Sequence, residues 1–168
     1  MHIFLLYPKI TAMDKCGCHR AHNCLEELRS DHQKILESFD GLEKSISKNP
    51  LVYEEIGEFL EFTKNFSEPH HKKEEKVLFP ALEKKGIPNE GGPIGMMLFE
   101  HETKRSHIKK IDEGFKEKNG EKILLNAKAA ISLMREHIEK ENNILYPMAE
   151  EAFTPEELDS LGEECAKL

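Results

Sequence analysis

The most constraining feature of this sequence is a pattern that occurs twice. In each copy a histidine is followed four residues later by a glutamate and ten residues later by a proline. The copies are His70 with Glu74 and Pro80, and His137 with Glu141 and Pro147. On a helix, positions i and i+4 lie on one face, so each copy can present an imidazole and a carboxylate to one metal ion. Two such helices facing each other would make a two-metal site. Helix-bundle di-iron proteins use this device, most often with i, i+3 spacing.

The spacing of apolar residues predicts an all-α chain of four long helices packed as a bundle. The 168 residues, 38% of them hydrophobic, can bury a core without disulfides. Expected helices run from Leu25 to Ile46, from Asn49 to near Gly86 with a kink at Pro80, between Gly95 and Asn119, and onward from Gly120. A short fifth helix should begin at Thr154-Pro155, where a threonine cap precedes a glutamate by three residues.

Each of these four long helices carries one histidine at a core position. The candidate ligands are His32, His70, Glu74, His101, His137 and Glu141. A single buried histidine is more often an ordinary hydrogen-bonded core residue. Six ionisable groups together are different, because unpaired buried charges cost several kcal/mol each while total stability is only about 5–15 kcal/mol. A metal centre shared by all six would remove that cost.

His71 and Glu75 form a second i, i+4 pair beside His70 and Glu74. They lie about 100° round the helix from the apolar stripe, and they do not match the repeat. We therefore take His70 and Glu74 as ligands, and keep His71 and Glu75 as alternative ligands or as groups that contact the ligands. His107 falls off the stripe of its helix and is expected to be exposed.

Charge and the N-terminus limit the partners and the compartment. A net charge of −8 argues against binding to nucleic acid or to an anionic membrane surface, since both select a basic face. The apolar stretch from Met1 to Pro8 is too short to span a bilayer and has no basic region before it, which predicts a cytoplasmic protein. We expect an N-terminal segment over residues 1–20, with Met13 as an alternative start, and one domain over residues 21–168.

Cysteines and histidines crowd together just before the first helix, and a last cysteine lies far along the chain. The crowded residues are Cys16, Cys18, His19, His22 and Cys24. They could form a second metal site or a redox thiol pair. Their spacing does not match paired zinc motifs, and cysteines in a cytoplasmic chain do not imply disulfides, so a reduced segment without a site is the preferred interpretation. Cys165 has no partner motif.

Taken in order, the motifs resemble those of hemerythrin-like proteins with an HHE cation-binding domain. The resemblance covers Leu25 to Glu151 and rests on Asp31-His32, His70-x3-Glu74 with Leu78-Phe79-Pro80, Glu100-His101-Glu102, and His137-x3-Glu141 with Leu145-Tyr146-Pro147. It implies an up-down four-helix bundle around a non-haem di-iron centre, with the two glutamates bridging two iron ions. Nitrogen and oxygen ligands of this kind also accept manganese or zinc.

The resemblance implies small reactive partners. Members of this family bind dioxygen, sense oxygen or iron, or respond to nitric oxide and oxidative damage, so O2, NO or peroxide are the expected ligands, and we leave open whether the protein is an enzyme. Oxygen carriers have a fifth histidine where this chain has Arg105, whose guanidinium cannot ligate iron. We therefore expect a more open centre that O2 oxidises irreversibly, unless Tyr53 or His107 supplies a fifth ligand.

Two alternative functions stay open. One is repair of iron-sulfur clusters after nitrosative or oxidative damage, because repair proteins of this kind share the paired motifs and carry an N-terminal cysteine segment, of which Cys16 and Cys18 are a faint reminder. The other is a regulatory module whose iron state alters contacts of the N-terminal segment or the last helix. The sequence names no protein partner for it.

Overall fold

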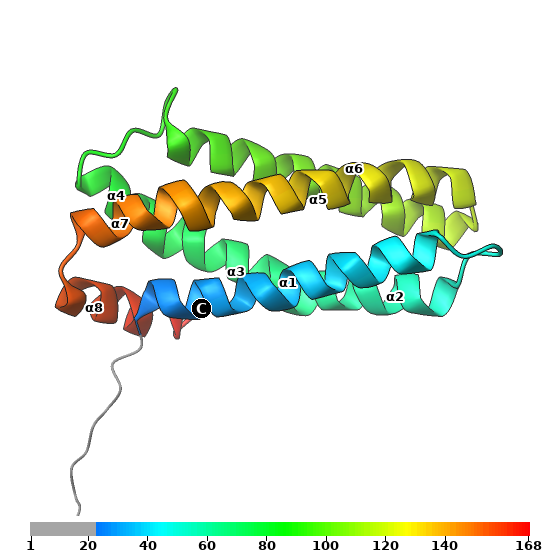
Figure 1. Cartoon of the computed structure of the whole chain (residues 1–168), viewed down its shortest axis with the longest axis horizontal. Coiled ribbons are helices and arrows are strands. Elements are labelled where there is room, and N and C mark those ends of the chain that lie inside the picture. Colours follow the sequence, from blue (N-terminus) through cyan, green and yellow to red (C-terminus); the bar gives the residue numbers. More distant parts are fainter. Residues whose placement is uncertain (1–22) are drawn as a thin grey trace, which may run out of the picture.

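The computed structural model describes residues 23–168 and is built from helices (Figure 1). The elements are α1 (Cys24–Ile46), α2 (Tyr53–Phe62), η1 (Thr63–Ser67), α3 (Glu68–Lys73), η2 (Glu74–Leu78), α4 (Phe79–Lys84), α5 (Pro93–Glu117), α6 (Gly120–Lys140), η3 (Glu141–Leu145), α7 (Tyr146–Ala152) and α8 (Pro155–Cys165). The elements named η are single π-helical segments. They join α2 to α4 into one long helix, and α6 to α7 into another, so the bundle has the four long helices that the sequence predicts.

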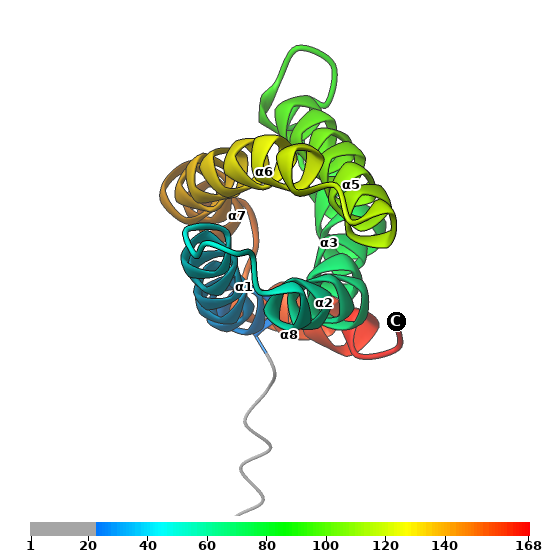
Figure 2. The same ribbon diagram turned by 90° about the vertical axis from the view of Figure 1, so that its right-hand side faces the viewer.

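The four long helices form a ring around a common interior (Figure 2). α1 packs against α2 and α6, and α5 packs against the same two helices, so neighbours in the chain are neighbours in space. Short connections make successive helices run in opposite directions. The predicted all-α bundle is therefore confirmed. α8 follows the fourth helix and packs across α1 and η2.

Side-chain caps fix where several helices begin. Asn23 accepts a hydrogen bond from the backbone N–H of Leu25 at the start of α1, and Thr154 forms the expected capping box with Glu157 at the start of α8. The second long helix begins at Tyr53, not at Asn49 as predicted. Val52 before it has extended backbone, and the preceding Leu51 packs against the core from the turn.

The three π-helical segments share one cause. Each is followed two residues later by a proline, at Pro69, Pro80 and Pro147. Proline has no N–H to donate and its ring crowds the carbonyl one turn earlier. In each segment the N–H before the proline donates to the carbonyl five residues back, which widens the turn and relieves that crowding. The kink expected at Pro80 therefore takes the form of a π-helical segment, and each segment rotates the residues after it by about 100°.

Two apolar clusters fill the interior. The proximal cluster, next to α8, contains Cys24, Leu25, Leu28, Val77, Leu78, Phe79, Leu82, Ile94, Met97, Leu145, Tyr146, Ala149, Phe153, Leu158 and Cys165. The distal cluster contains Ile35, Phe39, Leu42, Ile46, Ile56, Phe59, Ile111, Ile123, Ala127, Ala130, Ile131, Met134 and Ile138. On α1, His32 lies between Leu28 of the first cluster and Ile35 of the second. The buried histidines form a polar layer between the two.

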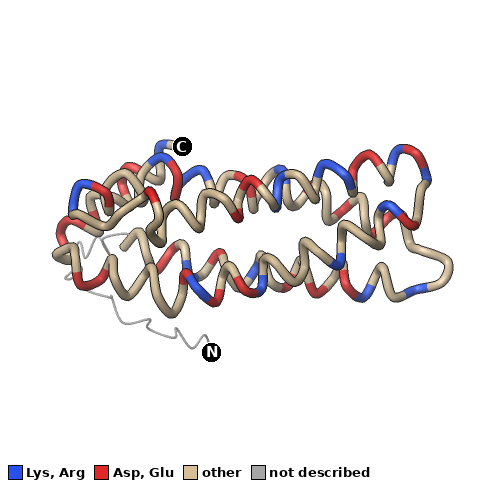
Figure 3. Tube along the Cα trace, turned by 90° about the horizontal axis from the view of Figure 1, so that it is seen from above, with Lys and Arg blue, Asp and Glu red and all other residues tan. Residues whose placement is uncertain are grey.

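Residues of both charge signs are interspersed along the helices (Figure 3). Basic residues are interspersed with acidic ones and do not gather on one face. Within residues 23–168, no helix combines the length and apolarity that crossing a membrane requires.

Truncating Phe39 tests the distal cluster. Its side chain is 1% exposed, and its ring meets that of Phe59 edge-on at 5.1 Å between centroids. Phe39→Ala should lower the free energy of unfolding by roughly 3–5 kcal/mol, because it removes buried contacts and leaves a cavity. Urea denaturation measures the change. Leu125→Ala, at a side chain 73% exposed, is the control and should cost almost nothing. Equal effects of the two substitutions would contradict the assigned core.

Candidate metal centre

Seven buried side chains from the four long helices meet in the polar layer. They form two groups that could each hold a metal ion: His71, Glu74, His101 and His137 in the first, and His32, His70, Glu74 and Glu141 in the second. Within each group the ligand atoms lie within 4.8 Å of one another. All seven residues are at most 1% exposed. The structure thus brings together all six residues proposed from the sequence and adds His71.

Glu74 belongs to both groups. Its Oε2 atom lies 3.6 Å from Nε2 of His70 in the second group and 3.4 Å from Nε2 of His101 in the first. η2 begins at Glu74, so the π-helical turn directly follows this ligand position. A carboxylate in this position can bridge two metal ions.

Glu141 is placed in a similar way from the opposite long helix. Its Oε2 atom lies 3.1 Å from Nε2 of His32 and 3.2 Å from Nε2 of His137. Its Oε1 atom lies 4.0 Å from Nε2 of His101. Glu141 therefore also lies near histidines of both groups, although it belongs only to the second group.

Several polar atoms of the cluster are buried without a hydrogen-bond partner. Within the described residues they include Nδ1 and Nε2 of His70, Nδ1 of His71, Oε2 of Glu74 and both carboxylate oxygens of Glu141. An unsatisfied buried polar atom costs roughly 1–3 kcal/mol, and native proteins contain few of them. Metal coordination would satisfy the carboxylate oxygens and one nitrogen of each imidazole. The other nitrogen of His70, Nδ1, lies 3.5 Å from Oδ2 of Asp31. Imidazole nitrogens and carboxylate oxygens are donors that iron, manganese and zinc accept, so the residues present fit a metal centre.

Three of the histidines are oriented by hydrogen bonds from their outer nitrogens. The Nδ1 atoms of His32, His101 and His137 donate to Asn142 at 2.9 Å, to Glu75 at 2.8 Å and to Glu100 at 3.0 Å. With Nδ1 donating outward, Nε2 is the nitrogen that faces the cluster, and it offers a lone pair once the imidazole is neutral, which is the arrangement that metal-binding histidines use. Glu75, kept from the sequence as an alternative ligand or a contacting group, here contacts a ligand position.

Arg105 supports the centre from outside. Its guanidinium donates to Glu75 and to Glu68, each at 2.7 Å, and does not enter the cluster. Burial disfavours the charged form of Glu75, but hydrogen bonds from His101 and Arg105 more than offset this and lower the pKa of Glu75 to about 2. Glu75 therefore stays ionised and holds the ring of His101 in place.

Tyr146 touches both a bridging glutamate and a histidine. Its hydroxyl donates to Oε1 of Glu74 at 2.6 Å and lies 3.2 Å from Nε2 of His32. Burial, followed by the charge of Glu74, raises the pKa of the Tyr146 hydroxyl well above its usual value, so it remains a donor. The sequence analysis quoted Tyr146 within a motif and gave it no role. Its spacing of five residues after Glu141, across η3, was the available signal.

Protons occupy the cluster when no cation does. Burial and the charge of Glu141 raise the pKa of Glu74 well above its usual value. Burial disfavours the charged form of His137, yet the charge of Glu141 and the hydrogen bond to Glu100 outweigh it and raise the pKa of His137 to about 9. Burial lowers the pKa of His70 to about 4, which keeps that imidazole neutral. A metal ion would displace the protons on Glu74 and His137, so metal binding should release protons.

The placement of His71 outside the core stripe was wrong. The stripe was counted at a constant helical period, but η1 lies upstream and adds one residue to its turn. After η1, Ser67 is buried where Phe66 was expected, and Phe66 is half-buried. The rotation of about 100° brings His71 inward while His70 still faces the cluster. Four histidines were expected, and five converge.

The other proposed sources of a fifth ligand lie elsewhere. Nδ1 of His107, which is half-buried and not exposed, lies 3.1 Å from the side-chain oxygen of Asn126, and the ring of Tyr53 packs near Phe115. Neither belongs to the metal groups. Four residues of the N-terminal Cys/His cluster, Cys16, Cys18, His19 and His22, lie outside the described residues.

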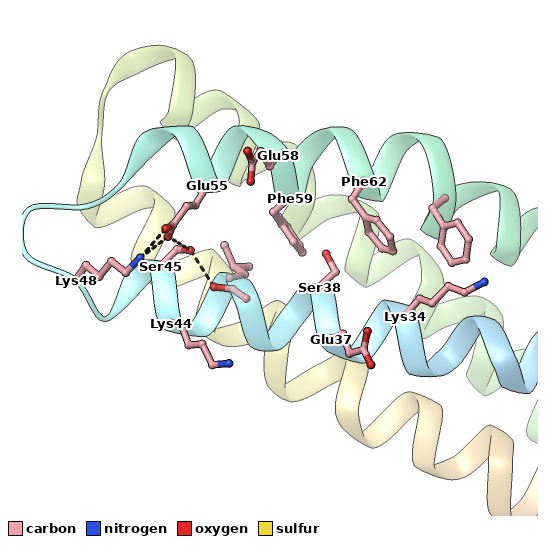
Figure 4. Close-up of a pocket in the computed structure, with 13 residues that line it drawn as sticks. Lys34, Glu37, Ser38, Lys44, Ser45, Lys48, Glu55, Glu58, Phe59 and Phe62 are labelled. Carbon is pink, nitrogen blue, oxygen red and sulfur yellow. Dashed lines mark hydrogen bonds and ion pairs between the residues drawn. The ribbon is translucent and has the colours of Figure 1, made fainter.

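A surface hollow lies between α1 and α2 (Figure 4), and within residues 23–168 it shares no lining residue with the metal groups. It has a volume of about 780 Å³, with an apolar wall that includes Phe59, Phe62 and Phe66. Lys34 and Glu55 lie on its rim. None of the described residues that line it belongs to either metal group, so the chemistry of the buried centre does not extend into this hollow.

Substituting His71 tests the seventh member. His71→Ala should lower the metal content of the purified protein, because one imidazole leaves the first group. His107→Ala is the matched control, since it removes an imidazole outside both groups and should leave the content unchanged. Metal analysis after equal loading of both variants gives the comparison. Full metal content in His71→Ala would show that His71 is only a neighbour of the ligands.

Comparison with known proteins identifies the fold family. Searches of curated proteins and of solved structures found no match to the chain. A family model described as the hemerythrin HHE cation binding domain matches residues 23–149, the part of the chain that supplies all seven residues of the cluster. The chain belongs to the family of hemerythrin HHE cation-binding domains.

Proposed function

We propose that this protein holds a non-haem di-iron centre that binds one small ligand, such as O2, NO or peroxide. One observation carries the proposal: two groups of buried imidazole and carboxylate donors share Glu74, and several of their atoms have no hydrogen-bond partner. A pair of iron ions would supply redox-active Lewis acids at this point. Manganese or zinc would fit the same donors, so the metal content of the purified protein must distinguish them from iron.

The number of donors supports a single open position. Five imidazoles and two bridging carboxylates offer about nine of the twelve positions on two octahedral ions, and an oxo or hydroxo bridge takes two more. The group with His71, His101 and His137 has three imidazoles, whereas the group with His32 and His70 has two. If two such ions were bound, the remaining position would lie on the ion held by His32 and His70. The hydroxyl of Tyr146, close to His32, is a hydrogen-bond donor on that side of the centre.

Burial limits the size of the ligand. A cleft of about 550 Å³ opens between the second long helix and α5, with Thr63, Glu68, Lys104 and Arg105 on its wall. Of these wall residues, Lys104 is 0% exposed, and its ammonium donates to Glu68 at 2.9 Å. The seven cluster residues are at most 1% exposed, so we expect a diatomic molecule or peroxide, and not a larger substrate, to reach the site.

The regulatory alternative draws on a separate observation. α8 packs against η2, the segment that begins with Glu74, so a change at the centre can reach the last helix through directly packed residues. The alternative of iron-sulfur cluster repair rests on the N-terminal cysteines, of which Cys16 and Cys18 lie outside the described residues. We therefore keep regulation as the second candidate function.

Iron content is the first test of the proposal. Protein produced with iron available should contain about two iron ions per chain. His70→Ala should lose most of this iron, whereas His107→Ala should keep it. Removing the metal with a chelator should lower the thermal midpoint, because the buried donors lose their shared partner. Protein that holds only zinc, or no metal, would overturn the di-iron assignment.

Oxygen binding is the second test. From Arg105 alone, the expectation was irreversible oxidation at a centre one imidazole short. With His71 in the cluster that shortage is removed, so we expect O2 to bind reversibly. Anaerobic diferrous protein is exposed to O2 and then to argon, and its absorption spectrum is followed over repeated cycles. Return of the diferrous spectrum without added reductant supports the proposal. Conversion to diferric protein that argon does not reverse would restore the earlier expectation.

A further inference from the structure

Two cysteines meet in the proximal apolar cluster. Cys24 is the first residue of α1 and Cys165 is the last residue of α8. Their sulfur atoms lie 3.5 Å apart, both thiols are free, and the side chains are 1% and 2% exposed. The sequence analysis grouped Cys24 with the N-terminal cysteines and found no partner for Cys165. The fold supplies that partner across 141 positions of the chain.

We propose that Cys24 and Cys165 form a redox-active dithiol, which hydrogen peroxide converts into a disulfide that fixes α8 to α1. A disulfide needs a sulfur separation of about 2.05 Å, so the two sulfur atoms must approach by roughly 1.5 Å. Both cysteines are at helix ends, where local opening costs less than in the middle of a helix. The proposal does not depend on the metal or on the proposed function.

The reaction balances in two steps. The thiolate of Cys165 attacks one peroxide oxygen, so that a sulfur–oxygen bond forms, the oxygen–oxygen bond breaks, and the leaving hydroxide takes up a proton to become water. The thiol of Cys24 then loses its proton and attacks the sulfur of Cys165, forming the sulfur–sulfur bond and releasing the second oxygen as water. The two thiols together lose two electrons, and these electrons reduce one molecule of hydrogen peroxide to two molecules of water.

The surroundings favour Cys165 as the attacking thiol. The hydrogen bond between the two thiols and the ammonium of Lys73 lower the pKa of the Cys165 thiol, and they outweigh burial and the carboxylates of Glu27 and Glu164, which raise it. The thiolate is the nucleophilic form of cysteine. Lys73 also pairs with Glu27 on α1, so this positive charge is held beside the thiols.

The dithiol joins an added helix to the part of the core that supports the metal centre. The family match ends at residue 149, whereas α8 spans Pro155–Cys165. Both cysteines belong to the proximal cluster, together with Tyr146 and with Val77 and Leu78 of η2. A disulfide would therefore fix α8 against the packing that positions Glu74 and Tyr146, and it would make this attachment respond to oxidants.

The test uses the whole chain of 168 residues, with Cys16→Ser and Cys18→Ser so that only the two proposed cysteines remain of the four. Excess hydrogen peroxide is added, its concentration is measured over time, and it is replenished for as long as it is consumed. Alkylation and mass spectrometry should show loss of both free thiols within one chain, and digestion should yield a cross-linked peptide pair containing Cys24 and Cys165. The thermal midpoint should rise by about 5 °C or more, because the closed loop is long, and dithiothreitol should reverse the change.

Single variants provide the controls. Cys24→Ser and Cys165→Ser in the same background should form no internal cross-link, and the thermal midpoint should not rise with peroxide. Because the main result comes from protein that retains both cysteines, it stands even if a single variant folds poorly. Thiols that stay free under sustained peroxide, sulfinic or sulfonic acid without a disulfide, or disulfides only between chains would each overturn the proposal.

Discussion

The structure depends on the burial of two carboxylates and five imidazoles in the middle of a helix bundle. Glu74 and Glu141 are 0% exposed and each contacts histidines from both metal groups. Without cations, such a layer needs protons on Glu74 and His137 and leaves donor atoms unpaired. The apolar clusters above and below hold the helices at fixed distance, so the layer cannot relax by opening to water. This makes the bundle a rigid cage whose charge requirement bound metal cations would meet.

The polar groups around this layer make the cage specific. Glu75, Glu100 and Asn142 each accept a hydrogen bond from the outer nitrogen of one histidine, which fixes the nitrogen that faces the centre. Arg105 then holds Glu75, so a residue that appeared to mark a missing ligand serves to support another ligand position. The centre therefore extends at least one hydrogen bond beyond the residues that could contact a metal.

The sequence analysis assumed a constant helical period, so its predictions hold only where the helices keep that period. Helical periodicity located the four long helices and the six proposed residues, since apolar spacing and the His-x3-Glu repeat are local properties of the chain. The capping box at Thr154 was equally local and was found. The same method failed at His71, because a constant period does not hold across η1. It also gave no partner for Cys165, because that contact joins positions 141 residues apart.

The sequence alone determined the helical class, the helix order and the repeat that places an imidazole and a carboxylate on each of two helices. These follow from side-chain periodicity and from prolines, whose effects act within a few residues. Only the tertiary structure decided that both His70 and His71 face the cluster. It also decided that Tyr146 reaches Glu74 and that α8 brings Cys165 to Cys24. Those outcomes depend on accumulated rotation along a helix and on contacts between distant segments, and neither quantity is expressed in the local pattern of residues.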